Sequence, residues 1–231
     1  MLVPSCDEKE PHELGTARAN EAGSGTLHHT KLNMKTAAFG FRMHSGWGVL
    51  VAVSGDTDLV EVVLRRRIVV MDTSLRGGKQ PYHYAAELPS DQCERHIAKC
   101  AALSESMAHA AIVEALEELK KLEYRITSAA VVMASGRALP SLPAILASHP
   151  LIHTAEGEFF RKAVIKACAQ LKIPTAQIRE REIEERAKCA FGKRTAEILR
   201  RISRMGKILG PPWTADHKAA ALAAWLTLEN R

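Results

Sequence analysis

Paired or clustered cysteines are missing from this chain of 231 residues. Its five cysteines include no C-x-x-C pair and have no spacing typical of a zinc knuckle or a disulfide framework. They are Cys6, Cys93, Cys100, Cys168 and Cys189. This pattern predicts free thiols in a reducing, cytoplasmic environment.

Long apolar runs are absent as well. Nowhere do about 18 apolar residues follow one another, as a membrane-spanning helix requires. The first ten residues also lack the basic flank and apolar core of a signal peptide. We therefore expect no membrane partner and a cytoplasmic location.

Three widespread functional motifs are also missing. The chain has no G-x-S-x-G nucleophile elbow, and no G-x-G-x-x-G follows its first apolar run. Residues 23–26 read Gly-Ser-Gly-Thr, but no strand pattern precedes them and no Gly-Lys-Thr follows. These absences argue against a serine hydrolase, a dinucleotide-binding enzyme and a P-loop nucleotidase.

The composition is that of a globular chain, with 46% hydrophobic and 25% charged residues. Residues 1–35 hold almost no large apolar side chains, so we expect a disordered N-terminal tail there. Residues 36–231 are long enough for a single domain with a sizeable core. The formal net charge of +6 suits an anionic partner only if the charge is localised.

Alternating apolar runs and amphipathic periodicities predict an α/β domain. Strands are expected at Trp47–Ser54, Val60–Met71, Tyr82–Ala85, Ile126–Ala134 and Ile173–Ile178. Helices are expected at Ser90–Glu123 with Ser90 as its cap, Leu142–Ala147, Thr154–Leu171, Glu180–Lys207 with a break near Gly192, and Ala215–Leu228. Because Trp47–Ser54 and Ile126–Ala134 are apolar on both faces, we predict that they are adjacent, parallel central strands.

Positive charge is concentrated in the last third of the chain. Between Arg179 and Lys207 there are ten Lys or Arg against five Asp or Glu. The candidate nucleic-acid-binding residues are Lys188, Lys193, Arg194, Arg200, Arg201, Arg204 and Lys207. They predict sequence-independent phosphate contacts. The alternative is an ordinary solvated face, in which the glutamates of residues 180–185 pair with Arg186 and Lys188.

Two histidine-containing segments are candidates for other chemistry. His149, His153 and Glu156 are close in sequence, but His149 precedes Pro150 and is not expected to share a helix face with His153, so no metal site is predicted. His217 follows Asp216 and is interpreted as part of a polar first helical turn rather than as an acid–base group. Arg65, Arg66 and Arg67 are interpreted as a solvated strand end.

The order of these elements, from Trp47 to about Leu228, resembles the ribonuclease H-like fold and within it the Holliday-junction resolvases. The segments that carry the resemblance are the apolar hairpin, the long helix before Ile126–Ala134, Ile173-Pro-Thr-Ala-Gln-Ile-Arg-Glu, Lys188-Cys-Ala-Phe-Gly-Lys-Arg and Asp216-His-Lys-Ala-Ala-Ala-Leu-Ala-Ala-Trp. The resemblance implies a mixed sheet, an antiparallel hairpin plus parallel strands, flanked by helices. It also implies two divalent ions held by carboxylates at the ends of the central strands and at the start of the last helix.

The sequence departs from that carboxylate pattern. The resemblance implies an aspartate near Ala52 or Ser54, but Trp47–Ser54 contains none and Asp56 and Asp58 lie in the turn beyond it. Ile126–Ala134 likewise ends without an acid. Asp216 fits the first acidic position of the last helix, but Ala219 stands where a second acid is expected. One carboxylate cannot supply the oxygen ligands of two hydrated Mg²⁺ ions.

We therefore expect a ribonuclease H-like protein that has lost its catalytic acids, needs no cofactor and binds nucleic acid without cutting it. One alternative is a nuclease dependent on Mg²⁺ or Mn²⁺ that uses acids at unusual positions, Asp56, Asp72, Glu158 and Asp216. Another is a protein-interaction or assembly module, including a homo-oligomer, built on the helix Ser90–Glu123 or on the alanine-rich last helix.

Overall fold

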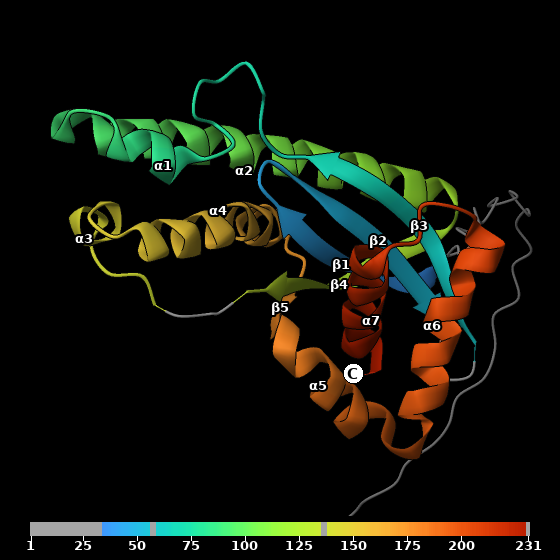
Figure 1. The fold of residues 1–231 in the computed structure, drawn as a ribbon. Helices are drawn as coiled ribbons and strands as arrows, with labels where there is room; N and C mark the ends of the chain where they lie inside the picture. The colour runs from blue at the N-terminus through green and yellow to red at the C-terminus, as the bar shows by residue number, and fades with distance from the viewer. Residues whose placement is uncertain (1–33, 56–58, 135–137, 230–231) are drawn as a thin grey trace, which may run out of the picture. The chain divides into compact units, whose positions relative to one another are not determined.

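The computed structural model describes residues 34–55, 59–134 and 138–229 (Figure 1). The strands are β1 (Lys35–His44), β2 (Trp47–Gly55), β3 (Val60–Val69), β4 (Tyr124–Met133) and β5 (Thr175–Arg179). The helices are α1 (Pro81–Ala86), α2 (Ser90–Lys121), α3 (Leu142–Leu146), α4 (His149–Gln170), α5 (Ile183–Phe191), α6 (Thr195–Leu209) and α7 (Ala215–Glu229). Two single 3₁₀ turns, Glu180–Glu182 and Gly192–Arg194, precede α5 and α6.

The strands form one mixed sheet in the order β3-β2-β1-β4-β5. β2 is antiparallel to both β1 and β3, whereas β4 is parallel to β1 and to β5. The predicted fold class, a hairpin joined to parallel strands and flanked by helices, is confirmed. The predicted adjacency of Trp47–Ser54 and Ile126–Ala134 is wrong, because β1 lies between these two strands and β2 runs opposite to β4.

β1 is the strand that the sequence pattern missed. Its residues Phe39, Phe41 and Met43 alternate on one face of the sheet and are buried, which is the period-2 pattern of a strand. The other face of β1 carries Ala38 and Gly40, residue types with low strand propensity that hid the signal. β1 begins at Lys35 and is therefore the first described strand of the sheet, ahead of Trp47–Gly55.

One face of the sheet is covered by α2 and α4, which lie side by side across it (Figure 1). The buried side chains of α2 recur at three- and four-residue steps, as predicted, and include Cys93 and Cys100. Pro89, rather than Ser90, occupies the cap position, with no side-chain hydrogen bond. The expected strand Tyr82–Ala85 is wrong, because Pro81 opens helix α1 there, at a position where a missing N–H costs nothing.

The opposite face is covered by α7, with α5 and α6 beside it (Figure 1). Trp225 is fully buried, and the alanines of α7 allow the helix to lie almost on the strands. At Gly40 of β1 the helix lies so close that an added Cβ would be 1.8 Å from the carbonyl oxygen of Ala220. A glycine is therefore required at this crossing.

Two further predictions for the C-terminal third agree with the structure, whereas the helix expected at Thr154–Leu171 begins earlier, at His149. β5 is an edge strand, and the charged helical stretch breaks into α5 and α6 at Gly192, which has φ = 54°. Among the described residues, no helix is long and apolar enough to cross a membrane. Residues 1–33 of the expected tail lie outside the described residues, whereas Lys35, its last residue, is the first residue of β1.

Candidate functional site

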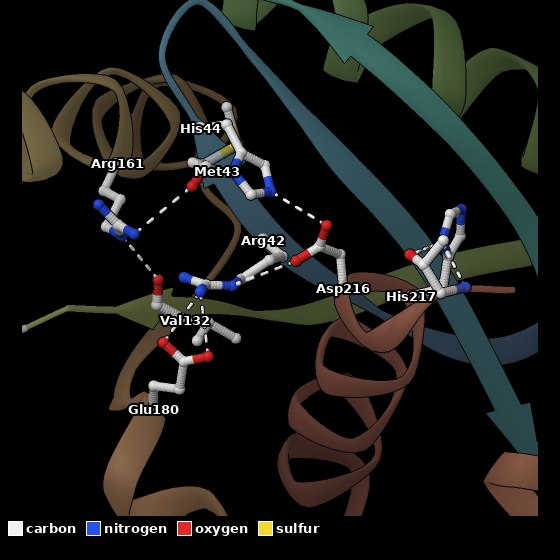
Figure 2. Close-up of polar contacts among 9 residues, drawn as sticks. Arg42, Met43, His44, Val132, Arg161, Glu180, Asp216 and His217 are labelled. Carbon is white, nitrogen blue, oxygen red and sulfur yellow. Dashed lines mark hydrogen bonds and ion pairs between the residues drawn. The ribbon is translucent and has the colours of Figure 1, made fainter.

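The carboxyl ends of β1, β4 and β5 meet at one edge of the sheet, because these three strands run in the same direction. The first turn of α7 lies at the same edge and brings Asp216 to the end of β1 (Figure 2). The pairing of β1 with β4 ends at Arg42 and Val132. In open sheets with parallel strands, such a diverging edge is where binding sites form.

Arg42 is the centre of this edge. Its Nη2 lies 3.0 Å and 2.9 Å from the two carboxylate oxygens of Glu180, the residue that follows β5. Its Nε lies 3.6 Å from Oδ1 of Asp216, whose Oδ2 lies 3.1 Å from Nε2 of His44 (Figure 2). The side chain of Arg42 is only 16% exposed, so its ion pairs lie in a partly desolvated site. Through these pairs the guanidinium joins the end of β5 to the start of α7.

A second guanidinium lies where β1 and β4 separate. Arg161 of α4 is buried; its Nε donates to the Val132 carbonyl at 2.9 Å and its Nη2 lies 3.4 Å from the Met43 carbonyl (Figure 2). Burial and the neighbouring Arg42 lower the pKa of Arg161, whereas Glu158 and Glu180 act in the opposite direction. The edge thus holds two fixed cationic groups.

The donor set at this edge does not fit a pair of divalent ions. The Glu180 and Asp216 carboxylates are directed at the Arg42 guanidinium. Arg42 itself stands near the end of β1. Ala219, at the expected second acidic position of the last helix, supplies no oxygen ligand.

The other acids of the nuclease alternative do not join Asp216 in any described contact. Asp56 lies outside the described residues. Asp72 is exposed and accepts a hydrogen bond from the Ser74 backbone N–H at 2.8 Å, which lowers the pKa of its carboxyl. Glu158 is buried on α4, and its Oε1 has no hydrogen-bond partner among the described residues.

A pocket of about 500 Å³ opens beside this edge, lined by β3 arginines, Trp47 and the first turn of α7. Trp47 stacks on His44 with ring centroids 4.4 Å apart, and the Arg67 guanidinium lies 4.5 Å from the Trp47 ring. His217 is buried, and its Nδ1 lies 2.8 Å from the Thr214 hydroxyl. It therefore belongs to the start of the helix, as predicted.

The interpretation of the three neighbouring β3 arginines as a solvated strand end is wrong for Arg65 and Arg66, whereas Arg67 is exposed. Arg65 donates to the carbonyl oxygens of Leu209, Gly210 and Pro212 at 2.5, 2.8 and 2.5 Å. Arg66 points to the other face and pairs with Glu118 of α2. These two guanidinium groups thus join β3 to other parts of the fold.

The predicted basic residues are spread over three elements. Lys188 lies on α5, Lys193 and Arg194 on the turn after it, and Arg200, Arg201, Arg204 and Lys207 on α6. Arg200, Arg204 and Lys207 are exposed and recur at a helical spacing that places them on one side of α6. Arg201 pairs with Glu197 at 3.0 Å.

The alternative of internal charge neutralisation holds for part of this segment. Glu182 pairs with Arg179 at 3.0 Å and with Arg186 at 3.4 Å. The basic residues of α6 beyond Arg201 have no ion pair with any residue that the structure describes. The localised charge is therefore on α6 rather than on α5.

Sequence reasoning missed Arg42, His44, Arg161 and Glu180 as members of one site. The available signal was the alternation of residues 39–43, which predicts a strand and places Arg42 near its end. Nothing in the local sequence of Arg161 distinguishes it from a solvated helix arginine.

No protein-family model matches the chain, and no curated protein matches it significantly. Among solved structures, Thermus thermophilus RuvC in complex with a Holliday-junction substrate is 14% identical, with a TM-score of 0.46 over 84% of this chain and 93% of that chain. A further structure of Thermus thermophilus RuvC is 13% identical, with a TM-score of 0.46 and the same two coverages. The strand order and strand directions given above define the fold without these similarities.

Proposed function

We propose that this protein binds nucleic acid through phosphate contacts and does not cleave it by metal-dependent hydrolysis. The observation that carries the proposal is the position of Arg42. Its guanidinium lies between Glu180 and Asp216, where carboxylates of this fold family hold metal ions.

Electrostatics supports the loss of a divalent site. At a separation of 4 Å and an effective dielectric constant near 20, two unit charges interact by about 4 kcal/mol, so a divalent ion beside Arg42 meets about twice that repulsion. A guanidinium is never deprotonated under physiological conditions. The two acids therefore have a permanent counter-ion that competes with any metal.

The binding surface that we propose is the outer side of α6, with Arg200, Arg204 and Lys207. The opposite side of this helix buries Ile198 and Ile202 in the apolar cluster that contains Trp225 of α7, which fixes the direction of the basic side. Arg65 and the Trp213 indole, which donates to the Ile202 carbonyl at 2.8 Å, hold the end of α6 in place. A rigid helix with exposed cations suits phosphates rather than base edges.

The assembly alternative has less support. The large exposed apolar side chains among the described residues are Leu59, Val69, Leu122 and Ile208. They lie at separate points on the chain, at the two ends of β3, after α2 and near the end of α6. They do not form the apolar stripe that a helix interface requires. The cytoplasm remains the proposed location, because of the cysteine spacing.

The test of binding is a titration of a labelled duplex and a labelled four-way junction at several salt concentrations. The variant Arg200→Glu/Arg204→Glu/Lys207→Glu is compared with Lys99→Glu/Lys120→Glu/Lys121→Glu, which makes the same charge change on exposed positions of α2 and at its end. We expect wild type and the α2 control to bind both substrates. The α6 variant should bind more weakly, with a salt slope reduced by about 0.9 for each phosphate that it no longer neutralises. Equal weakening by both variants would refute the α6 surface.

The test of catalysis uses the same junction with Mg²⁺ or Mn²⁺ in excess. We expect no cleavage by wild type or by Asp216→Asn. Metal-dependent cleavage that disappears in Asp216→Asn would establish the nuclease alternative instead.

A further inference from the structure

Three histidines of two helices, none of them a neighbour of Arg42 in the site described above, lie close together. They are His83 of α1 and His149 and His153 of α4, and one ring nitrogen from each lies within 4.8 Å of the other two. The ring centroids are 5.6 Å apart for His83 and His149, 4.9 Å for His83 and His153, and 4.4 Å for His149 and His153. The rings of each pair stand at 67° to 85° to one another, so none of the pairs is stacked face to face.

The fold creates this cluster through the start of α4. The expectation that Pro150 keeps His149 off the helix face of His153 is wrong, because α4 begins at His149 and Pro150 lies in its first turn. Proline is tolerated there, since the N–H groups of a first turn have no partner within the helix. His149 and His153 are therefore one turn apart on a single helix face.

Glu156 gives the cluster a carboxylate behind one imidazole. Its side chain is buried, and Oε1 accepts hydrogen bonds from the backbone N–H groups of Tyr82 and His83 at 2.8 and 3.1 Å. The same oxygen lies 3.3 Å from Nδ1 of His83, whereas Oε2 has no partner among the described residues. A carboxylate that holds Nδ1–H leaves Nε2 free as a ligand, which is the usual arrangement behind a metal-bound histidine.

We propose that His83, His149 and His153 bind one Zn²⁺ ion or a similar first-row divalent ion. Neutral imidazoles are ligands that suit zinc, whereas Mg²⁺ and Ca²⁺ prefer oxygen. Zn–N bonds of about 2.0–2.1 Å in a tetrahedron require nitrogens about 3.4 Å apart. His149 and His153 are exposed, so small side-chain rotations can close the distances to this value.

The ion would join α1 to α4 and leave a fourth ligand position for water or another group. Because three ligands alone hold the metal, its coordination would be incomplete within this cluster, as in zinc sites that bind a further molecule. The Glu156 carboxylate would balance part of the added charge. This site is separate from the surface on α6, and its existence does not depend on nucleic-acid binding.

The experiment uses the full chain without a histidine tag, stripped of metal by a chelator. Calorimetric titration with Zn²⁺ should give one ion per chain, and Co²⁺ should give the visible absorption bands of a tetrahedral complex. His149→Ala/His153→Ala should raise the dissociation constant at least about a hundredfold, since removal of a ligand costs more than the 10–100-fold typical of an outer-shell change. His109→Ala, on α2, is the matched control and should bind as wild type does.

A second variant tests the arrangement rather than the ligands. Glu156→Gln keeps an oxygen that accepts from the Tyr82 and His83 N–H groups but removes the negative charge, so we expect about 10–100-fold weaker Zn²⁺ binding with unchanged stoichiometry. Circular dichroism shows whether each variant is folded. Equal Zn²⁺ affinity in wild type and in folded His149→Ala/His153→Ala, or no binding by wild type at micromolar Zn²⁺, would overturn the proposal.

Discussion

The crossing of α7 over β1 allows a quantitative test of the packing that positions Asp216. Gly40→Ala would place a Cβ atom 1.8 Å from the Ala220 carbonyl oxygen, 2.7 Å from its carbonyl carbon and 3.2 Å from its Cα. All three atoms belong to the helix backbone, so no side-chain rotation can relieve the contact. A separation of about 3.3 Å is needed, and α7 must therefore move from the sheet by about 1.5 Å.

Such a movement disturbs the best-packed part of the molecule. Ala220, Ala223, Ala224 and Trp225 are all fully buried against the strands. Overpacking of a core typically costs about 1–3 kcal/mol, and we expect a value of about 3 kcal/mol because neither the added Cβ nor the helix backbone can rotate out of the contact. For a domain of this size, that corresponds to a fall in Tm of about 6–12 °C.

Thermal and urea unfolding followed by circular dichroism measures this change. The matched control is Gly157→Ala in α4, where the added Cβ would meet its nearest atom, Nη1 of Arg161, at 3.6 Å. Because this contact is ordinary and alanine favours a helix interior, the control should gain about 0.5–1 kcal/mol. A Gly40→Ala protein with the Tm of wild type would show that α7 does not lie on β1 as described.

Three further predictions concern single side chains. Burial, and to a smaller extent Arg65, lowers the pKa of His217 in the folded protein, so the unfolded chain binds a proton more readily. The free energy of unfolding should therefore fall as the pH drops below about 6.5. Urea titrations at pH 5 and 7.5 should show a smaller pH dependence for His217→Asn than for wild type. Arg65→Ala should lower the free energy of unfolding, measured with urea, by about 2–3 kcal/mol, since it leaves backbone carbonyls at the end of α6 without their charged donor. A change below about 0.5 kcal/mol would contradict the hydrogen bonds of Arg65. Burial raises the pKa of Cys168 to about 11, so its thiol is protonated and inaccessible at pH 8. In a Cys6→Ser background, a thiol reagent at pH 8 should label exposed Cys189 and should label Cys168 only after the protein unfolds. Rapid labelling of Cys168 in the folded protein would disprove its burial.

The elements with strong periodicity were predictable from the sequence. The spacing of apolar residues in α2 and the continuous apolar run of β4 are enough to identify both elements. β1 was missed because one of its faces carries alanine and glycine, which pack under α7 rather than favour a strand. Because β1 was missed, β2 and β4 were predicted to be adjacent and parallel, whereas β1 lies between them and they run in opposite directions.

The site was less predictable than the fold, for a physical reason. Asp216 and the basic residues of α6 are visible as charges in the sequence, but ion pairs between distant segments depend on strand order. Arg42 and Glu180 are 138 positions apart and meet only because β1, β4 and β5 end at one edge. The three histidines depend in the same way on α1 packing against α4.

The central place of α7 has a consequence for the order in which the protein folds. Every described strand of the sheet precedes α7 in the chain, yet one face of β1 and β2 packs against α7, around Trp225. While the chain is being synthesised, that apolar face stays in contact with water until the last described helix emerges from the ribosome. A nascent chain that ends before residue 215 should therefore be prone to aggregation and depend on chaperones, and native structure should form only late in translation.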